Sequence, residues 1–300
     1  MEPVSVSSDD ARLKTAFVFA GGGSFGAIHV GMLRSLARRG IAADMVVGSS
    51  VGALNGAYYA GNPTIEGIQR LETIWRGLRR KDVFPLTWRT IMGFLYRRDF
   101  LIASDGLRQL VDQNLTYRNL EDAEIPIHIV ATDILSGDTV VLSEGSAAQA
   151  IIASAAIPAA FAPVHFNDLY LADGAISSNT PVTVAVARGA RRLIVLPTGY
   201  ACALGKPPVG VVANALHALT LLIVRQLVNE LQGLDHSIDY FVVPPLCPLI
   251  GSPYDFSQTS ELIEWAARST DAWLTEGGLD HPGVHAQLST HKHKQPQRGV

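Results

Sequence analysis

The sequence DMVVGSSVGALNGAYYA, residues 44–60, places Ser50 between an apolar run and a helix-compatible segment. Gly48 and Gly52 flank this serine, and such small residues let a strand and a helix approach closely while the hydroxyl projects outward. The helix would aim its N-terminal amides at charge that develops near the hydroxyl. The pattern predicts a nucleophile elbow with Ser50 as nucleophile. Ser49 occupies a variable position of the pattern, and we expect it to be a turn residue.

A glycine-rich loop, GGGSFGA at residues 21–27, precedes this stretch between a predicted strand and a predicted helix. Three of its glycines match the dinucleotide fingerprint, and Asp44 lies at about the sequence distance of a ribose-binding acid. The same amides can instead bind the oxyanion of a tetrahedral acyl intermediate. A dinucleotide enzyme has no need of a second strand–turn–helix unit that carries a serine. The elbow at Ser50 therefore favours an oxyanion loop, with a nucleotide-binding or non-catalytic module as the alternative.

The third motif is Asp173-Gly174-Ala175, which follows the apolar run at residues 169–172. A serine hydroxyl needs a base within hydrogen-bond reach. A carboxylate in a partly desolvated pocket has a raised pKa and can serve as that base without an imidazole. The competing interpretation is an ordinary Asp-Gly turn.

The remaining chain alternates between short apolar runs and helical periodicity, which predicts an α/β fold with a largely parallel sheet covered on both faces. Ligand sites in such folds lie at the carboxyl ends of the strands, where both glycine motifs fall. The predicted strands are 15–20, 44–47, 127–132, 139–142, 169–171, 192–196 and 240–243. The predicted helices are 26–39, 51–60, 146–154, 181–188, 209–231 and 260–274.

These three motifs, in this order, resemble those of the patatin-like phospholipase family. The resemblance implies a three-layer α/β/α sandwich with a helical insertion, and a lipid acyl hydrolase with a Ser50–Asp173 dyad that requires no cofactor. It assigns the oxyanion hole to Gly21, Gly22, Gly23, Ser24 and Gly26, and it makes Gly174 and Ala175 the motif after the general base. It also implies that the segment Ala153–Phe161 packs beside the active site. Phe25 stands where many members carry a cation, which bears on headgroup preference.

A Ser-His-Asp α/β-hydrolase is a second alternative, because His217, His236, His281 and His285 all follow Ser50. None of these histidines has a motif around it. No cluster of side chains has metal-ligand spacing, so we expect no metal.

Composition limits the class of partner. The net charge of −3 gives no reason to expect nucleic acid. Cys202 and Cys247 alone indicate no disulfide framework, and the N-terminus lacks a signal peptide, so we expect a cytoplasmic protein. A lipid or fatty-acyl ester is the expected substrate.

We expect an N-terminal tail at 1–14, a catalytic domain at 15–280 with an insertion at about 64–119, and a C-terminal tail at 281–300. Polar residues within 209–231 argue against a membrane span and for an amphipathic helix. Cations and aromatics alternate in the insertion and predict peripheral membrane contact. The alternative is a solvated cap helix whose aromatics pack onto the core. They are Trp75, Arg76, Arg79, Arg80, Lys81, Phe84, Trp88, Arg89, Phe94, Tyr96, Arg97 and Arg98.

Overall fold

The computed structural model describes residues 13–83, 104–158, 160–199, 207, 209–247, 249 and 252–283. Its strands are β1 (Thr15–Phe19), β2 (Met45–Ser49), β3 (Ile127–Asp133), β4 (Thr139–Leu142), β5 (Val164–Phe166), β6 (Leu169–Asp173), β7 (Arg192–Leu196) and β8 (Asp239–Val242). Its α-helices are α1 (Ala27–Arg38), α2 (Val51–Gly61), α3 (Ile65–Gly77), α4 (Arg80–Val83), α6 (Asp105–Asn114), α7 (Ala147–Ser154), α8 (Ala175–Ser178), α9 (Val182–Ala187), α10 (Val211–Gln232) and α11 (Thr259–Thr275). Short 3-10 helices lie at η1 (Gly23–Gly26) and η2 (Leu120–Asp122).

The strands form one sheet in the order β5-β6-β3-β2-β1-β7-β8, with β4 also paired to β3. Strands β3, β2, β1, β7 and β8 pair in parallel, whereas β4, β5 and β6 pair antiparallel at one end. The predicted α/β class with a largely parallel sheet is confirmed. Strand β5 was not predicted, because its three residues are not fully buried and show no apolar run.

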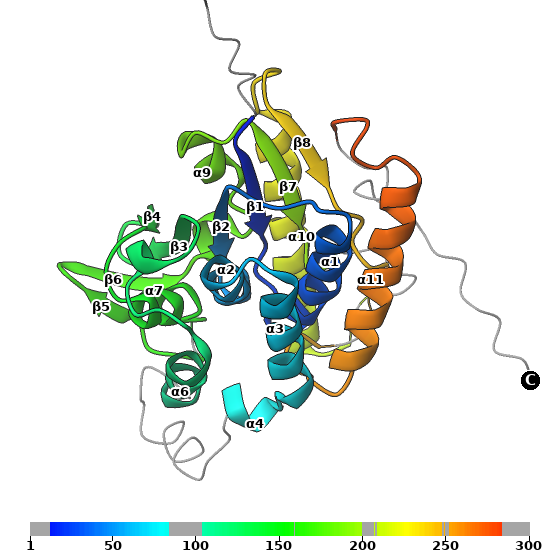
Figure 1. Cartoon of the computed structure of the whole chain (residues 1–300). Helices are drawn as coiled ribbons and strands as arrows, with labels where there is room; N and C mark the ends of the chain where they lie inside the picture. Colours follow the sequence, from blue (N-terminus) through cyan, green and yellow to red (C-terminus); the bar gives the residue numbers. More distant parts are fainter. Residues whose placement is uncertain are drawn as a thin grey trace, which may run out of the picture.

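Helices cover both faces of this sheet and form a three-layer sandwich (Figure 1). One core cluster packs α1, α2, α3, α7 and α11 on one face, with Phe17, Phe19 and Val46 from the strands. A second cluster packs α9 and the end of α10 on the other face, with Val18 and Val47. Strand side chains alternate between the two faces, and both faces are buried, so the central strands are apolar throughout.

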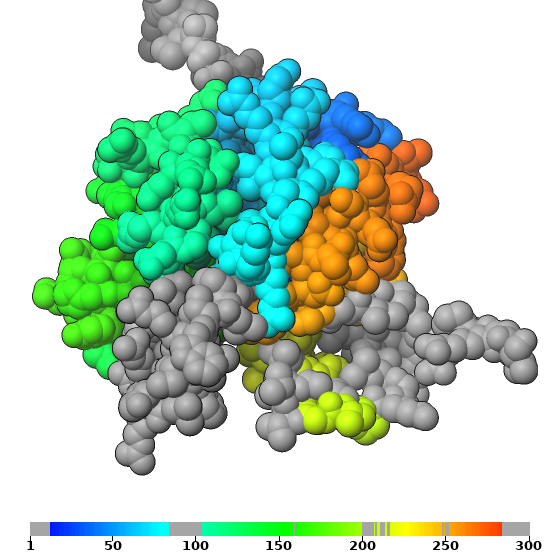
Figure 2. All heavy atoms as spheres, turned by 90° about the horizontal axis from the view of Figure 1, so that it is seen from below, coloured from blue at the N-terminus to red at the C-terminus, as the bar shows by residue number. Residues whose placement is uncertain are grey.

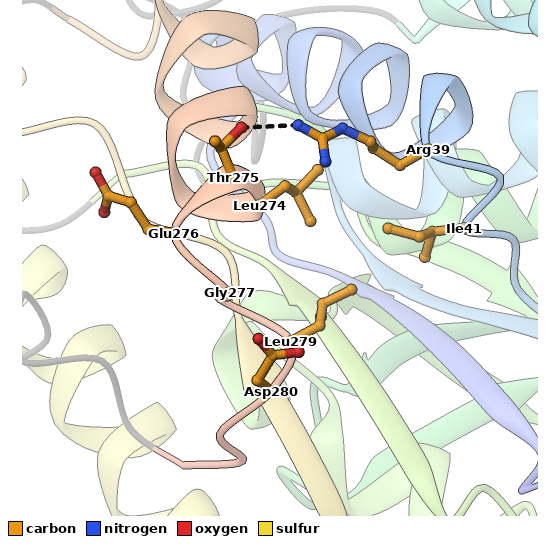
Figure 3. A pocket seen from close by; sticks show the side chains of 8 residues that line it. All are labelled: Arg39, Ile41, Leu274, Thr275, Glu276, Gly277, Leu279 and Asp280. Atoms are coloured by element: carbon orange, nitrogen blue, oxygen red, sulfur yellow. Dashed lines mark hydrogen bonds between the residues drawn. The ribbon is translucent and has the colours of Figure 1, made fainter.

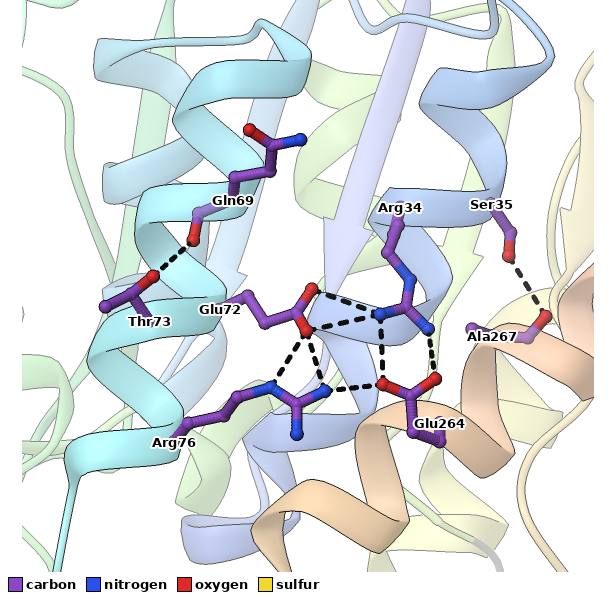
Figure 4. A network of polar contacts seen from close by, with 8 residues as sticks. All are labelled: Arg34, Ser35, Gln69, Glu72, Thr73, Arg76, Glu264 and Ala267. Atoms are coloured by element: carbon purple, nitrogen blue, oxygen red, sulfur yellow. Dashed lines mark hydrogen bonds and ion pairs between the residues drawn. The ribbon is translucent and has the colours of Figure 1, made fainter.

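Helices α1, α3 and α11 are joined by an ion-pair cluster (Figure 4). Arg34 of α1 lies between Glu72 of α3 and Glu264 of α11, at 3.2 and 2.7 Å. Arg76 contacts the same two carboxylates, at 2.7 Å from Glu72 and 2.5 Å from Glu264. This cluster holds the first helix of the insertion against the body of the fold.

The predicted interfacial role of Trp75 is wrong, and this ring packs onto the core, as the alternative of a cap helix predicts. Trp75 is only 2% exposed, and its ring stacks on Phe256 with centroids 6.2 Å apart. Arg76 belongs to the ion-pair cluster just described. The reason is that α3 is amphipathic, and the aromatic ring falls on the face that meets the core. Arg76 is nevertheless exposed, as are Arg79, Arg80 and Lys81. The aromatics and cations at residues 84–98 lie outside the described residues.

Cys247 is disulfide-bonded, which corrects the expectation that the cysteines form no disulfide. A low cysteine count does not exclude a bridge, because pairing depends on whether the fold brings two sulfurs within reach. The expectation of a cytoplasmic protein therefore loses the support that it took from the cysteines. The expected division into a domain of residues 15–280 between two tails stays a prediction.

Helix α10 has two different halves. Near its end, Leu227 and Leu231 are buried in the second core cluster. Nearer its start, Leu219 and Leu222 are 50% and 67% exposed. Among the described residues, no helix combines the length and the apolar character needed to cross a membrane. A helix is therefore observed where the sequence predicts one, and its exposed leucines lie near its middle.

Candidate active site

Ser50 lies at the junction between β2 and α2, with φ of 55° and ψ of −125°. This left-handed conformation is costly for a residue with a side chain, and it turns the chain sharply from strand to helix. Gly48 and Gly52 allow the turn, because a Cβ at Gly48 would collide with the Gly52 backbone and one at Gly52 with the Phe19 carbonyl. The turn predicted from the sequence is therefore present. The expectation that Ser49 is a turn residue is wrong, since Ser49 is the last residue of β2 and is fully buried.

Asp173 ends β6 directly beside the serine. Ser50 Oγ donates to Asp173 Oδ2 at 2.7 Å, and the Ala175 amide donates to Asp173 Oδ1 at 2.8 Å. Strand β6 pairs antiparallel with β3, which sets Asp173 opposite Ala131. Two residues 123 positions apart in the sequence thus meet in one buried contact, at 6% and 3% exposure.

Burial raises the pKa of Asp173 to about 6, and the hydrogen bonds from Ala175 and Ser50 lower it against that trend. Desolvation dominates because the charged carboxylate loses water, and it accepts hydrogen bonds from a neutral amide and a neutral hydroxyl. A carboxyl group with a pKa near neutrality is mostly ionised at pH 7 and remains basic enough to accept a proton from a hydroxyl.

The segment Ala153–Phe161 lies beside this pair, as the sequence predicts. Ser154 Oγ accepts the Ser50 amide at 2.8 Å and donates to the Val130 carbonyl at 2.5 Å. The amides of Asp173 and Gly174 donate to the carbonyls of Ala156 and Ser154, at 3.0 and 3.1 Å. One segment therefore braces both members of the pair through backbone contacts.

The glycine-rich loop passes Ser50 between β1 and α1. The Gly21 amide donates to the Asn179 carbonyl at 3.0 Å, and the Ser24 amide donates to the Pro253 carbonyl at 2.7 Å. Within the described part of the chain, the amides of Gly22 and Gly23 have no acceptor. Of the five loop residues that the resemblance assigns to an oxyanion hole, Gly21 and Ser24 have amides engaged in protein contacts, whereas the amides of Gly22 and Gly23 are available.

The loop is fixed by residues from three distant segments that sequence reasoning missed. Thr198 Oγ1 donates to the Gly21 carbonyl at 2.5 Å, and Ser24 Oγ donates to the Ser252 carbonyl at 3.2 Å. Gly23 adopts φ of 60°, and a Cβ there would collide with the Pro253 carbonyl. Gly26 ends the turn, and Phe25 packs against the first core cluster. No motif surrounds Thr198, Asn179 or Pro253, so only the fold could identify them.

The segment 252–256 covers this loop on the way from β8 to α11. Its Phe256 stacks on Trp75. Its Tyr254 is half-buried, and burial together with the negative charge of Asp173 raises the pKa of the phenol. This segment therefore forms a wall of the candidate active site that the sequence did not predict.

The two alternative interpretations find less support in the geometry. Asp44 precedes β2, and its carboxylate accepts the Thr15 amide at 2.8 Å, at the start of β1. The glycine loop follows the opposite end of β1, so Asp44 is a strand length away from a nucleotide bound there. Ser50 Oγ contacts the carboxylate directly, with no imidazole between them. His285 lies outside the described residues.

A pocket of about 530 Å³ lies elsewhere, where α1 and α11 end (Figure 3). Arg39 Nη2 donates to Thr275 Oγ1 at 2.7 Å at its rim. Its lining includes Ile41, Leu274 and Leu279 but none of the predicted site residues. This hollow is therefore not the candidate active site.

Comparisons with known proteins agree with the motif order. A family model for patatin-like phospholipase matches residues 17–186. The chain is 29% identical over 209 residues to the patatin-like phospholipase domain-containing protein M110.7 of Caenorhabditis elegans, covering 65% of this chain and 18% of that protein. It is 30% identical over 212 residues to the lysophospholipase NTE1 of Mycosarcoma maydis, covering 66% of this chain and 11% of that protein. The chain thus spans less than a fifth of either relative.

Among solved structures, VipD from Legionella pneumophila aligns with a TM-score of 0.47 at 16% identity, over 88% of this chain and 67% of that one. The human GIVD cytosolic phospholipase A2, in complex with methyl gamma-linolenyl fluorophosphonate, aligns with a TM-score of 0.47 at 12% identity. That alignment covers 88% of this chain and 58% of the human one.

Proposed function

The chain belongs to the patatin-like phospholipase family, and we propose that it is a serine-dependent lipid acyl hydrolase that uses Ser50 and Asp173. The observation that carries the proposal is the 2.7 Å hydrogen bond from Ser50 Oγ to a buried carboxylate. A nucleophile held against its base at this distance needs no rearrangement before proton transfer.

In the proposed reaction, Ser50 Oγ attacks the ester carbonyl carbon while Asp173 Oδ2 accepts the hydroxyl proton. The carbonyl oxygen becomes an oxyanion, and the amides of Gly22 and Gly23 donate to it. Asp173 then gives its proton to the departing alcohol as the ester bond breaks. Water attacks the acyl-Ser50 ester, Asp173 accepts a proton from that water, and the fatty acid leaves as Ser50 regains its proton. The covalent intermediate divides one difficult step into two easier ones.

The pKa of Asp173, raised to about 6, fits the role of a base near neutral pH. The left-handed backbone at Ser50 fits the role of nucleophile, because strain of this kind concentrates at functional sites. The first turn of α2 adds its amide dipoles beneath the developing charge.

The test is labelling with a fluorophosphonate probe, read by intact mass and peptide mapping. We expect one adduct on Ser50 in the parent chain, no adduct in Ser50→Ala, and much slower labelling in Asp173→Asn. Ser49→Ala is the matched control, since this adjacent serine hydroxyl is buried without a hydrogen-bond partner in the described structure. Labelling of Ser49, or of Ser50→Ala at the parent rate, would contradict the proposal.

We further propose that the catalytic face contacts an anionic lipid surface. Helix α10 follows β7 and therefore starts near the carboxyl ends of the strands, with Leu219 and Leu222 exposed. The cyan segment that ends in α4 is on the face that Figure 2 shows from below, where the yellow-green start of α10 also appears. Arg80 and Lys81 of α4 are exposed. Exposed leucines and cations on one face suit apolar lipid tails and anionic headgroups.

Vesicle sedimentation tests this surface. The double variant Leu219→Asn/Leu222→Asn should bind vesicles more weakly than the parent, and Arg80→Glu/Lys81→Glu should lose the preference for anionic over zwitterionic vesicles. Ile65→Asn is the control, because Ile65 is also 50% exposed but starts α3, at the opposite end of that helix from α4. Equal binding by the leucine variant and the control would contradict the surface.

A further inference from the structure

Asn55 of α2 is fully buried, one and a half turns after Ser50, and it meets three groups from separate elements. Its Nδ2 donates to the Gly26 carbonyl at 2.8 Å and lies 3.1 Å from His29 Nδ1. Its Oδ1 accepts the indole Nε1 of Trp75 at 2.8 Å. Gly26 is the last residue of η1, the turn that presents the amides of Gly22 and Gly23.

The chemistry of the partners fixes the direction of every bond. An indole N–H can only donate and a carbonyl can only accept, so the orientation of the Asn55 amide is determined. His29 Nε2 lies 3.0 Å from the Leu196 carbonyl, which means that Nε2 carries the proton and Nδ1 accepts from Asn55. Burial lowers the pKa of His29 to about 3, so this imidazole stays neutral. Each hydrogen bond in the network therefore has only one possible donor and one possible acceptor.

The network joins the helix that carries the nucleophile to the turn that carries the oxyanion amides. The turn and the helix are closely packed, because a Cβ at Gly26 would collide with Val51 and with the Trp75 ring. Through Leu196 the same network reaches the end of β7, which precedes Thr198 and its bond to the Gly21 carbonyl. Both ends of the glycine loop are therefore tied to one buried set of side chains.

We infer that Asn55 is a positioning residue that sets the distance between Ser50 Oγ and the amides of Gly22 and Gly23. This inference rests on the proposed function of the Ser50 site. Asn55 does not touch the reacting atoms and acts through Gly26 and His29. Because a misplacement of about 1 Å in a catalytic group costs about 10²-fold in rate, the tie should control turnover more than ground-state binding.

The test compares Asn55→Ala with the parent in hydrolysis of a soluble short-chain p-nitrophenyl ester. We expect kcat to fall by about 10²-fold and KM to change by less than about twofold, since oxyanion contacts strengthen in the transition state. The rate of fluorophosphonate labelling at Ser50 should fall in parallel. Trp75→Phe keeps an aromatic ring near Phe256 but removes the Nε1 donor and part of the ring that lies beside Gly26, so kcat should fall several-fold.

Ser35→Ala is the matched control, because Ser35 is also fully buried and donates to a backbone carbonyl, that of Ala267, at 3.0 Å. This hydrogen bond joins α1 to α11 (Figure 4). Ser35→Ala should lose stability but keep kcat. A folded Asn55→Ala variant with the kcat of Ser35→Ala would overturn the positioning role.

If Asn55→Ala does not fold, the Trp75→Phe variant tests the positioning role in its place. An unchanged kcat in that variant overturns the inference. A parent chain that is neither labelled nor active overturns the proposed function, and the positioning role with it. An active parent with a fully active Asn55→Ala overturns the positioning role alone.

Discussion

At the end of β6, Asp173 is 3% exposed and its hydrogen-bond partners are a hydroxyl and an amide, whereas Glu264 of α11 has a 43% exposed side chain between two guanidinium groups. Burial raises the pKa of Asp173 to about 6. Hydrogen bonds and charge from Arg34 and Arg76 lower the pKa of Glu264 to about 2. A carboxyl group without a counter-charge is suited to accept a proton, and one between cations is suited to hold helices together.

The difference teaches that the carboxylate of the candidate active site destabilises the folded protein, whereas the carboxylate of the ion-pair cluster stabilises it. Ionised Asp173 destabilises the folded state, because its carboxylate is buried there and is hydrated in the unfolded chain. The ion-pair cluster strengthens it modestly, since exposed pairs are screened by water and salt. Four predictions separate these two roles.

The largest effect is expected from Asp173→Asn. Loss of the base should lower kcat by about 10³-fold. The amide can still accept from Ala175 and can donate to Ser50 Oγ, so the fold should persist. At about pH 8 the variant should be more stable than the parent, by up to about 3 kcal/mol, because it lacks the buried charge. Ester hydrolysis and urea denaturation measure the two effects. A variant that is both inactive and less stable would contradict the idea of a desolvated base.

The pH dependence of the parent should follow Asp173. Below about pH 6 the carboxyl is protonated and cannot act as base, so kcat/KM should fall about tenfold per pH unit. The stability effect has the opposite sign, because the folded pKa lies above the ordinary 3.8. The contribution of Asp173 favours the fold below about pH 4 and is lost as the pH rises through about 6. The contribution of Glu264 is present above its ordinary pKa of 4.5 and is lost as the pH falls through about 2.

A pH–rate profile between about pH 4 and pH 8, together with denaturation curves between about pH 2 and pH 8, checks these signs. The control is Asp173→Asn, whose stability should lose the dependence assigned to Asp173. A parent profile that stays flat through pH 6 would show that another group, or no group, limits the reaction.

Arg34→Met should lower the stability of the protein and leave its activity unchanged. Removing this guanidinium leaves Glu72 and Glu264 facing only Arg76, so we expect a loss of about 1–2 kcal/mol in the free energy of unfolding. The loss should shrink at high salt because ion pairs are screened. Labelling of Ser50 should keep its rate. A large fall in kcat at unchanged folding would mean that the cluster also controls the site.

The smallest effect concerns backbone strain at Ser50. With φ of 55°, glycine is favoured at this position, so Ser50→Gly should be about 1 kcal/mol more stable than Ser50→Ala. Both variants lack the hydroxyl and should be inactive, which makes them a matched pair. Thermal unfolding measures the difference. Equal midpoints would mean that the chain relaxes the turn when the hydroxyl is absent.

Features of the site that depend only on neighbouring residues could be predicted from the sequence. The glycines around Ser50 are needed because strand and helix meet there, and a Cβ at Gly52 would strike the Phe19 carbonyl. The periodicity of α3 is equally local, but it did not reveal that Trp75 faces the core, because the ring directly precedes the cationic run that begins at Arg76.

The sequence by itself determined the alternation of strands and helices, the turn at Ser50, the glycine loop and the position of Asp173 at a strand end. Tertiary structure alone decided which amides of that loop are free, because Asn179 and Pro253 engage the others from far along the chain. It also decided the raised pKa of Asp173 and the burial of Asn55 with His29 and Trp75. The reason is physical: strain and periodicity depend on neighbouring residues, whereas desolvation and hydrogen-bond partners depend on what packs around a group once the chain has folded.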